Sequence, residues 1–187
     1  GPGAPHDRGR PHATEADAPP LTVIIPAYNE GEMVEKTIDS CAAANYPRDR
    51  LEIIVVDDGS RDDTWKHITR AAARHPGLVV PIRFPENRGK RAALAAGFER
   101  GRGDVFVTID SDSLVEPQTL LAVAGPFREP RIGAVAGKVV VYNRSAGWIP
   151  KMLQVRFTLS FVFLRSVQST YGSVVCCPGA LAAYRAS

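Results

Sequence analysis

The sequence is poor in cysteine and lacks the cysteine patterns that mark disulfide frameworks or zinc sites. Its cysteines are Cys41, Cys176 and Cys177. An odd number that includes an adjacent pair is not typical of a disulfide framework, and no Cys-x-x-Cys motif or Cys/His cluster predicts a zinc site. We therefore expect a reducing, cytosolic setting.

Long hydrophobic runs and a strong charge of one sign are also missing. No run of about 18 apolar residues occurs, so the sequence predicts no transmembrane helix. The formal net charge of +3 is too weak to indicate a nucleic-acid partner. This mild excess of positive charge fits an anionic small molecule or a lipid headgroup equally well.

Residues 1–20 lack aromatic and bulky aliphatic side chains and are rich in Pro, Gly and charge. Such a segment cannot bury enough apolar surface to offset the entropy of ordering, so we expect a disordered tail or a remnant of expression. Residues 21–187 are expected to form one folded domain.

What the sequence does contain is a regular alternation of strand and helix patterns. Strands are expected at 21–25, 51–57, 78–84, 104–110 and 132–143, and helices at 32–44, 62–75, 89–101 and about 117–125. Pro81 restricts the third strand to a sheet edge or a bulge. Strands separated by helices imply βαβ units, and therefore an α/β fold with a mostly parallel sheet covered by helices on both faces.

Three of the predicted strands run into polar clusters, at 26–30, 57–63 and 110–112. In parallel sheets, ligands bind beyond the carboxyl ends of the strands, so these clusters are candidates for a site. If the chain stays extended, Asp110 and Asp112 point to the same side and suit Mg²⁺ or Mn²⁺. The alternative is that these Asp and Ser residues only form turns and cap helices.

Residues 85–94, which follow the third strand, contain a Gly-Lys pair but not a phosphate-binding loop. Phe84 stands where that motif requires glycine, and Arg91 stands where it requires Ser or Thr. What remains is a helix N-terminus that carries Arg88, Lys90 and Arg91, and its free N–H groups favour an anion. The alternative is a solvated basic turn.

Four segments in this order resemble the family 2 glycosyltransferases across residues 21–187. They are "VIIPAYNE", "IIVVDDGSRDDT", "ENRGKRAALAAGFERGRGDVFVTIDSD" and "VVCCPGALAAYR". The last segment, with "YNRSAGW" and "RSVQSTYGSVVCC" before it, is most similar to the processive branch of hyaluronan, chitin and chitooligosaccharide synthases.

The resemblance implies a GT-A (Rossmann-like) fold, a UDP-sugar donor, a metal ion and inversion at the anomeric carbon. It implies a nucleoside pocket lined by Pro26, Tyr28 and Glu30, and contact between uracil and either Asp57 or Asp58. Lys90, with Arg88 or Arg91 nearby, would face the base or the diphosphate. Asp110 would approach the ribose or the metal, and Asp112 would bind the metal. Cys177 and Gly179 would flank the entering acceptor.

The same resemblance places the family's general base downstream of Ser187, so we expect residues 21–187 to be an incomplete catalytic domain that binds donor without efficient transfer. The family's membrane helices are expected beyond this chain. Residues 148–167 form either a buried helix or an interfacial helix on anionic lipid. The native protein is expected at the cytoplasmic face of the plasma membrane, and residues 1–187 by themselves are expected to be a soluble fragment.

The expected function is transfer of a hexose or N-acetylhexosamine from a UDP-sugar to a growing β-linked polysaccharide, with a saccharide acceptor. Two alternatives remain open at this stage. One is a non-processive enzyme that acts on a lipid or protein acceptor. The other is a nucleotide-sugar-binding module without turnover.

Overall fold

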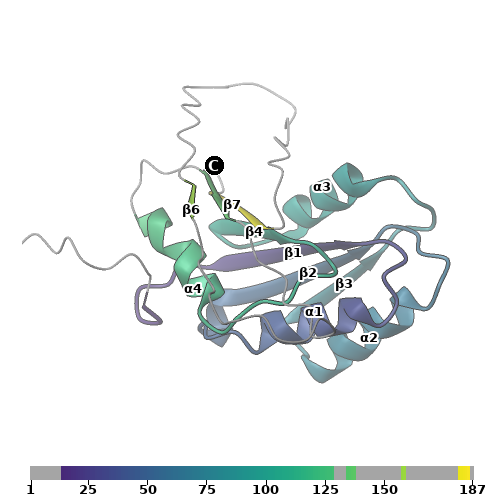
Figure 1. The fold of residues 1–187 in the computed structure, drawn as a ribbon, viewed down its shortest axis with the longest axis horizontal. Helices are drawn as coiled ribbons and strands as arrows, with labels where there is room; N and C mark the ends of the chain where they lie inside the picture. The colour runs from purple at the N-terminus through teal and green to yellow at the C-terminus, as the bar shows by residue number, and fades with distance from the viewer. Residues whose placement is uncertain (1–13, 129–133, 138–156, 159–180, 186–187) are drawn as a thin grey trace, which may run out of the picture.

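Strands and helices alternate along the chain much as the sequence predicts. The computed structural model describes residues 14–128, 134–137, 157–158 and 181–185 (Figure 1). The elements are β1 (Leu21–Ala27), α1 (Met33–Ala42), the 3₁₀ turn η1 (Arg48–Arg50), β2 (Leu51–Asp57), α2 (Thr64–Arg74), β3 (Val79–Arg83), α3 (Lys90–Arg100), β4 (Val105–Ile109), α4 (Thr119–Ala124), the 3₁₀ turn η2 (Gly125–Arg128), β5 (Ala134–Gly137), β6 (Phe157–Thr158) and β7 (Leu181–Arg185).

One sheet contains all the described strands, in the order β3-β2-β1-β4-β7-β5-β6. Strands β1 to β4 are parallel, as predicted, and β3 lies at the edge, where Pro81 is tolerated. Beyond β4, each of β7, β5 and β6 pairs antiparallel with its neighbour. The sequence analysis did not predict this antiparallel extension.

Strand β1 continues two residues past its predicted end and includes Pro26. Its pairing with β4 ends at Ile24, whereas its pairing with β2 continues to Ala27. The proline, which has no N–H to donate, therefore lies where one of the two neighbouring strands has already departed. This arrangement explains why Pro26 does not stop the strand.

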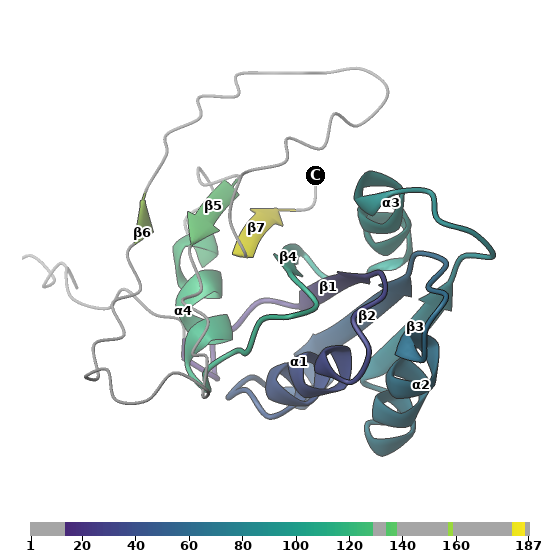
Figure 2. The ribbon, with the colours of Figure 1, turned by 45° about the vertical axis from the view of Figure 1, so that its right-hand side comes forward.

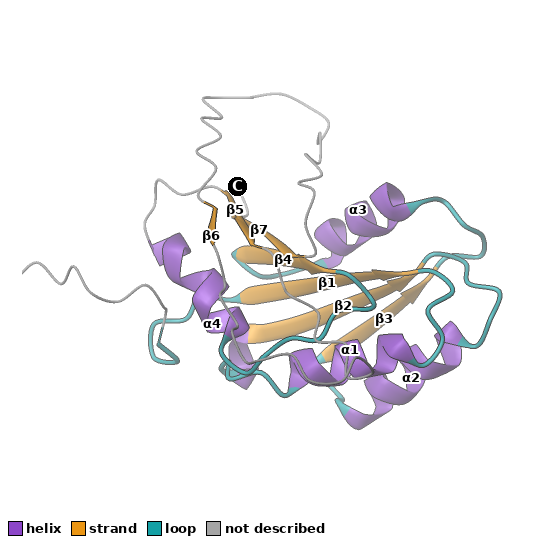
Figure 3. Cartoon of the chain, in the orientation of Figure 1, coloured by secondary structure: helices purple, strands orange, loops and turns teal. Residues whose placement is uncertain are grey.

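Helices cover both faces of the sheet, as Figures 2 and 3 show. Helices α1, α2 and α4 share one hydrophobic cluster with one set of strand residues, while α3 packs on the opposite face. The buried residues of α1 are Val34, Thr37, Ile38 and Cys41, which is the spacing of one helix face. The α/β architecture predicted from the sequence is thus confirmed.

Helix α3 approaches the sheet closely because it carries glycine at its contact with β1. A Cβ atom at Gly97 would lie 2.5 Å from Cγ2 of Ile24. A larger residue there would require the buried Ile24 side chain or the helix itself to shift. The glycine thus lets α3, which begins at Lys90, lie close to β1.

Within residues 14–20, the described part of the expected disordered tail, the segment around Ala18 contacts the domain although most of its neighbours are exposed. Ala18 belongs to the hydrophobic core, and the carbonyl oxygens of Ala16 and Ala18 accept hydrogen bonds from Arg50. The hydroxyl of Tyr46 donates to the carbonyl oxygen of Pro19, and burial raises the pKa of this hydroxyl, which keeps it protonated. These contacts are long-range and use main-chain acceptors, so composition could not reveal them.

The helix predicted over 148–167 is wrong at residues 157 and 158. These two residues form β6, whose backbone pairs with Gly137 and Ala136 of β5. A residue in a strand ladder is extended and cannot also be helical. The remainder of 148–167 lies outside the described residues. Of the predicted strand 132–143, the described part forms β5 (Ala134–Gly137), and residues 132–133 and 138–143 lie outside the described residues. Within the described ranges no helix has both the length and the hydropathy needed to cross a bilayer.

A network of charged side chains joins α1 to α2. Glu35 of α1 is bonded to His67 and Arg74 of α2, each at 2.5 Å, and Arg74 also contacts Asp39 at 2.7 Å. Burial of Glu35 raises its pKa, but the hydrogen bonds from His67 and Arg74 outweigh burial and hold the pKa below its ordinary value of 4.5. The ionised carboxylate therefore stabilises the pairing of the two helices.

Replacing Glu35 by Gln should lower the free energy of unfolding by about 1–2 kcal/mol at neutral pH, because charge-assisted hydrogen bonds are lost. Since the folded-state pKa is depressed, this contribution is present above pH 4.5 and disappears as the pH falls through the folded-state value. Urea denaturation at neutral and acidic pH measures it. Glu32→Gln, on an exposed carboxylate paired with Lys36, is the control. A Glu35→Gln deficit that does not shrink in acid would contradict this account.

A candidate ligand pocket at the carboxyl ends of β1 and β4

A pocket of about 340 Å³ opens at the carboxyl ends of the parallel strands. It lies where the strand order reverses, because β2 follows on one side of β1 while β4 lies on the other. Such switch points form a crevice in α/β sheets. The lining residues are Pro26, Ala27, Tyr28, Glu30, Asp58, Asn87, Gly89, Lys90, Asp110, Ser111 and Asp112.

Tyr28 offers an aromatic face to the pocket, since 43% of this large residue is exposed. The loop that carries it is held against the loop between β2 and α2 by two hydrogen bonds of Asn29. The Asn29 N–H donates to Oγ of Ser60 at 2.9 Å, and Asn29 Oδ1 accepts from the Arg61 N–H at 2.9 Å. Asn29 has φ of 51°, a left-handed conformation that asparagine tolerates better than most residues.

Asp58 lines the pocket, but the chain itself occupies its carboxylate. Oδ1 accepts from the Arg88 N–H at 2.7 Å, and Oδ2 accepts from the Gly89 N–H at 2.9 Å and from Asn87 Nδ2 at 3.0 Å. Asp58 is only 3% exposed. It therefore fixes the turn before α3 and, through it, the position of Lys90.

Gly59 makes this turn possible. Its φ is +69°, and a Cβ atom there would lie 2.3 Å from the carbonyl carbon of Glu86. Only glycine combines this conformation with so close an approach. The loop after β2 thus touches the loop before α3, and this contact brings Asp58 within reach of its three donors.

Two residues of the expected nucleotide site do not line the pocket. Asp57 is fully buried, with Oδ1 accepting from the Ser60 N–H and Oδ2 at 3.4 Å from Nε of Arg83. The guanidinium of Arg88 lies over the ring of Phe84, 4.8 Å from its centroid. Of the adjacent pair Asp57 and Asp58, the structure thus places Asp58 in the pocket.

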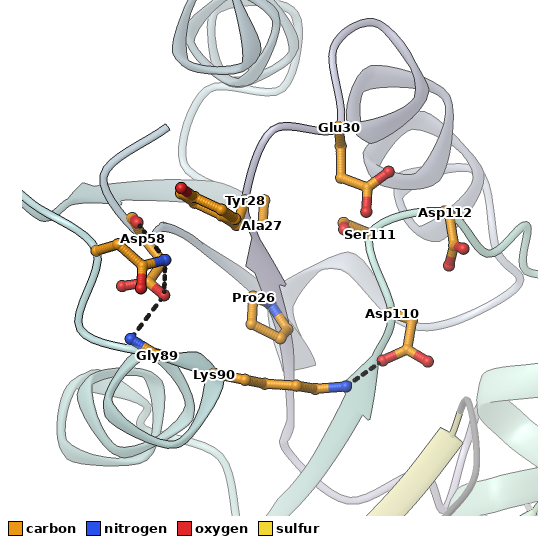
Figure 4. Close-up of a pocket in the computed structure, with 11 residues that line it drawn as sticks. Pro26, Ala27, Tyr28, Glu30, Asp58, Gly89, Lys90, Asp110, Ser111 and Asp112 are labelled. Carbon is orange, nitrogen blue, oxygen red and sulfur yellow. Dashed lines mark hydrogen bonds and ion pairs between the residues drawn. The ribbon is translucent and has the colours of Figure 1, made fainter. Parts of the chain in front are cut away.

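Lys90 and Asp110 face each other across the pocket and form an ion pair, with Nζ 2.6 Å from Oδ1 (Figure 4). Lys90 is the first residue of α3, and Asp110 follows the last residue of β4. In Figure 4, Asp58 and Gly89 lie on one side and Asp112 on the other, with the Lys90 side chain reaching between them.

The chain turns at residues 110–113 instead of staying extended, because the Ser113 N–H donates to the carbonyl oxygen of Asp110 at 3.1 Å. Asp110 and Asp112 both line the pocket nonetheless. Helix α1 supports this turn: Thr37 Oγ1 donates to the carbonyl oxygen of Ser111 at 2.8 Å. Ser40 Oγ accepts from the Val115 N–H at 3.0 Å.

The pair of carboxylates is suited to a divalent cation only with help from a ligand. Among the described residues, no group of three or more His, Cys, Asp or Glu side chains is placed to hold a metal. Two carboxylates supplemented by phosphate oxygens are, however, a common way to hold Mg²⁺ or Mn²⁺. Asp112 is exposed and Asp110 has one carboxylate oxygen away from Lys90, so the residues fit such an ion.

Sequence reasoning missed Ala27, Asn87, Gly89 and Ser111 as lining residues. Asn87 and Gly89 lie within the turn-forming stretch 85–91. Their closeness in the sequence to Lys90, an expected ligand residue, could have identified them as lining residues. The supporting role of Thr37 left no local signal, since its partner is 74 positions away. Cys177 and Gly179, expected at the acceptor side, lie outside the described residues.

Comparison with known families gives one match over almost the whole chain. The model described as "Glycosyl transferase family 2" matches residues 22–187. The matched range includes every described strand apart from the first residue of β1, and all the residues that line the pocket. The family match therefore covers both the fold and the site.

Curated relatives are similar over most of this chain. An N-acetylglucosaminyltransferase of Azorhizobium caulinodans is 34% identical over 92% of this chain and 45% of its own length. A hyaluronan synthase of Streptococcus pyogenes is 33% identical over 95% of this chain and 42% of its own length. The chain thus spans less than half the length of these relatives.

Solved structures share the fold. The mannosyltransferase PcManGT from Pyrobaculum calidifontis, in complex with GDP-Man and Mn²⁺, is 34% identical with a TM-score of 0.63, over 71% of this chain and 38% of that chain. TarS 1-349 from S. aureus is 22% identical with a TM-score of 0.57, over 70% of this chain and 38% of that chain. Both are glycosyltransferase-like in fold, which agrees with the GT-A architecture expected from the sequence.

Proposed function

The chain belongs to glycosyl transferase family 2, and from this membership and the pocket we propose that it transfers a hexose or N-acetylhexosamine from a UDP-sugar to a growing β-linked polysaccharide. The observation that carries the proposal is one pocket in which Lys90, Asp110 and Asp112 meet at the carboxyl ends of the strands. Relatives named N-acetylglucosaminyltransferase and hyaluronan synthase favour N-acetylglucosamine or a related sugar.

The nucleoside part of the donor is proposed to lie on Tyr28. The ring is exposed within the pocket and can stack on a base, with Pro26 beside it at the end of β1. Glu30, farther along the same loop, also lines the pocket and can accept a hydrogen bond from a ribose hydroxyl.

The diphosphate is proposed to lie at the N-terminus of α3. Lys90 supplies a positive charge there, and the first N–H groups of the helix add the favourable end of the helix dipole. Asp58 keeps this helix end in place through its hydrogen bonds to the preceding turn. A lysine at a helix start, unfavourable by itself, is explained by an anionic ligand.

We propose that Asp110 and Asp112 hold Mg²⁺ or Mn²⁺ together with the donor diphosphate. The PcManGT structure contains Mn²⁺, which supports a divalent ion in this fold. When bound, the ion stabilises the negative charge that builds on the departing nucleotide. The two carboxylates would hold the ion, and the ion would supply the positive charge that faces the diphosphate.

Inverting transfer also requires a group that takes the proton of the acceptor hydroxyl as it attacks. Among the described carboxylates that line the pocket, Asp58 holds the α3 turn, Glu30 is assigned to the ribose, and Asp110 and Asp112 are assigned to the metal. We propose that the base and the acceptor contacts at Cys177 and Gly179 belong to parts outside the described residues, and that membrane contacts involve residues of 148–167 other than 157 and 158, which form β6. The whole protein is proposed to work at the cytoplasmic face of the plasma membrane.

A second candidate is a mannosyltransferase with a GDP-sugar donor. The observation that favours it is the 34% identity to PcManGT, which was solved with GDP-Man. The alternative of a single transfer to a lipid or protein acceptor concerns the acceptor and applies with either donor. A nucleotide-sugar-binding module without turnover is the third possibility.

Calorimetry with UDP, UDP-N-acetylglucosamine, GDP and GDP-mannose, each with Mn²⁺, separates these candidates. The proposal expects the uridine ligands to bind at least about tenfold tighter than the guanosine ligands, a difference of about 1.4 kcal/mol. The reverse order would favour the mannosyltransferase. Release of UDP from UDP-N-acetylglucosamine with and without an oligosaccharide acceptor, measured for a protein that also carries the general base expected downstream of Ser187, distinguishes an enzyme from a binding module.

A further inference from the structure

We propose that Lys90 is an internal counterion that occupies the metal-binding carboxylate Asp110 until a nucleoside diphosphate draws it away. In this arrangement the diphosphate prepares the metal site by removing the lysine, so nucleotide and metal bind cooperatively. This inference rests on the proposed function, because it needs both a diphosphate and a divalent cation in the pocket.

The geometry of the pair carries the first step. The Lys90 ammonium lies 2.6 Å from Oδ1 of Asp110, which is the distance of a strong charge-assisted hydrogen bond. Both side chains line the same pocket, and Lys90 is the only cationic residue among its described lining residues. An ammonium in contact with Asp110 lies close to where a divalent ion on that carboxylate would have to bind.

The local charge carries the second step. Asp110 and Asp112 contribute two negative charges, and Lys90 cancels one of them while it stays on Asp110. A divalent ion that approaches without nucleotide meets a neutralised carboxylate and a repelling ammonium. When the ammonium turns to a diphosphate, both carboxylates are left to the ion.

The exposure of the pair makes this exchange easy. The Lys90 side chain is 55% exposed and that of Asp110 is 35% exposed. Ion pairs in such surroundings contribute little to stability. In the wild type, the need to displace Lys90 from Asp110 therefore lowers the affinity for a divalent ion only about two- to fivefold. The flexible lysine stem lets the ammonium turn to a new partner without movement of α3.

The test is Lys90→Met, with the Mn²⁺ affinity measured by electron paramagnetic resonance of the free ion, alone and with saturating UDP. In the variant, Mn²⁺ alone should bind about two- to fivefold tighter than in the wild type. The factor by which UDP tightens Mn²⁺ binding should fall by about the same amount. Uridine, which lacks phosphate, should not tighten Mn²⁺ binding in either protein.

Lys36→Met is the matched control, because Lys36 also forms a lysine–carboxylate pair, with Glu32 at 3.1 Å, is similarly exposed at 58%, and does not line the pocket. It should leave both Mn²⁺ affinities unchanged. The inference is overturned if Lys90→Met leaves Mn²⁺ binding and its coupling to UDP as in the wild type, or if Lys36→Met has the same effect. A wild-type chain that binds neither UDP nor Mn²⁺ would overturn the donor site itself, and a thermal melt confirms that each variant is folded.

Discussion

Replacing Asp112 by Ala should abolish the contribution of Mn²⁺ to UDP binding. Asp112 is exposed and lines the pocket beside Asp110, so its loss removes one of only two protein carboxylates proposed for the ion. Removing even an outer-shell partner of a metal ligand typically costs about 10- to 100-fold in metal affinity. We expect the affinity for Mn²⁺ to fall about that far, and the affinity of UDP measured with Mn²⁺ to fall to the value measured with a chelator.

The fold should tolerate this change, because the Asp112 side chain is not part of the core. Asp49→Asn, at an exposed aspartate of η1 away from the pocket, controls for the loss of one surface charge. Calorimetric titration of UDP with Mn²⁺ and with chelator measures both variants. Unchanged Mn²⁺-dependent affinity in the Asp112→Ala protein would remove this residue from the metal site.

Replacing Asp58 by Ala should weaken UDP and inorganic pyrophosphate to a similar extent and should also destabilise the fold. The carboxylate accepts three hydrogen bonds from the turn before α3, and without it the Arg88 and Gly89 N–H groups lose their acceptor. Two unsatisfied, partly buried donors cost about 2–4 kcal/mol in unfolding free energy. The same turn positions Lys90, which is proposed to contact the diphosphate. The variant should therefore lose the contact that UDP and pyrophosphate have in common.

We therefore propose a structural role for Asp58 in place of the uracil contact implied by the family resemblance. The uracil contact would instead make Asp58→Ala weaken UDP more than pyrophosphate. Asp58→Asn keeps one acceptor oxygen and should give intermediate losses. Calorimetry with both ligands, together with urea denaturation, measures the effect. A variant of normal stability that loses UDP but keeps pyrophosphate would restore the uracil contact.

Much of the donor side of the site was accessible from the sequence, because it depends on local rules. Strand ends of a parallel sheet meet at one edge, so Pro26, Asp58 and Asp110 were expected together, and they line one pocket. Pro81 predicted an edge strand, and β3 is one. These inferences needed only the chain order of the elements and the chemistry of single residues.

What the sequence could not predict depends on contacts between distant segments. The sequence pattern could not distinguish Asp57 from Asp58. In the structure Asp57 lies against Arg83, whereas Asp58 lines the pocket. Arg88 was likewise a candidate to contact the diphosphate, but its guanidinium lies over the ring of Phe84. The antiparallel pairing of β7 with β4 joins residues about 75 positions apart, and local sequence patterns do not predict such a pairing.

The most direct test of the account is a crystal structure of the chain with UDP and Mn²⁺. The account predicts the uracil ring on Tyr28, the diphosphate in contact with Lys90 at the start of α3, and Mn²⁺ on Asp112 with Asp110 released from Lys90. Nucleotide bound away from this pocket, or Mn²⁺ bound without either carboxylate, would contradict it.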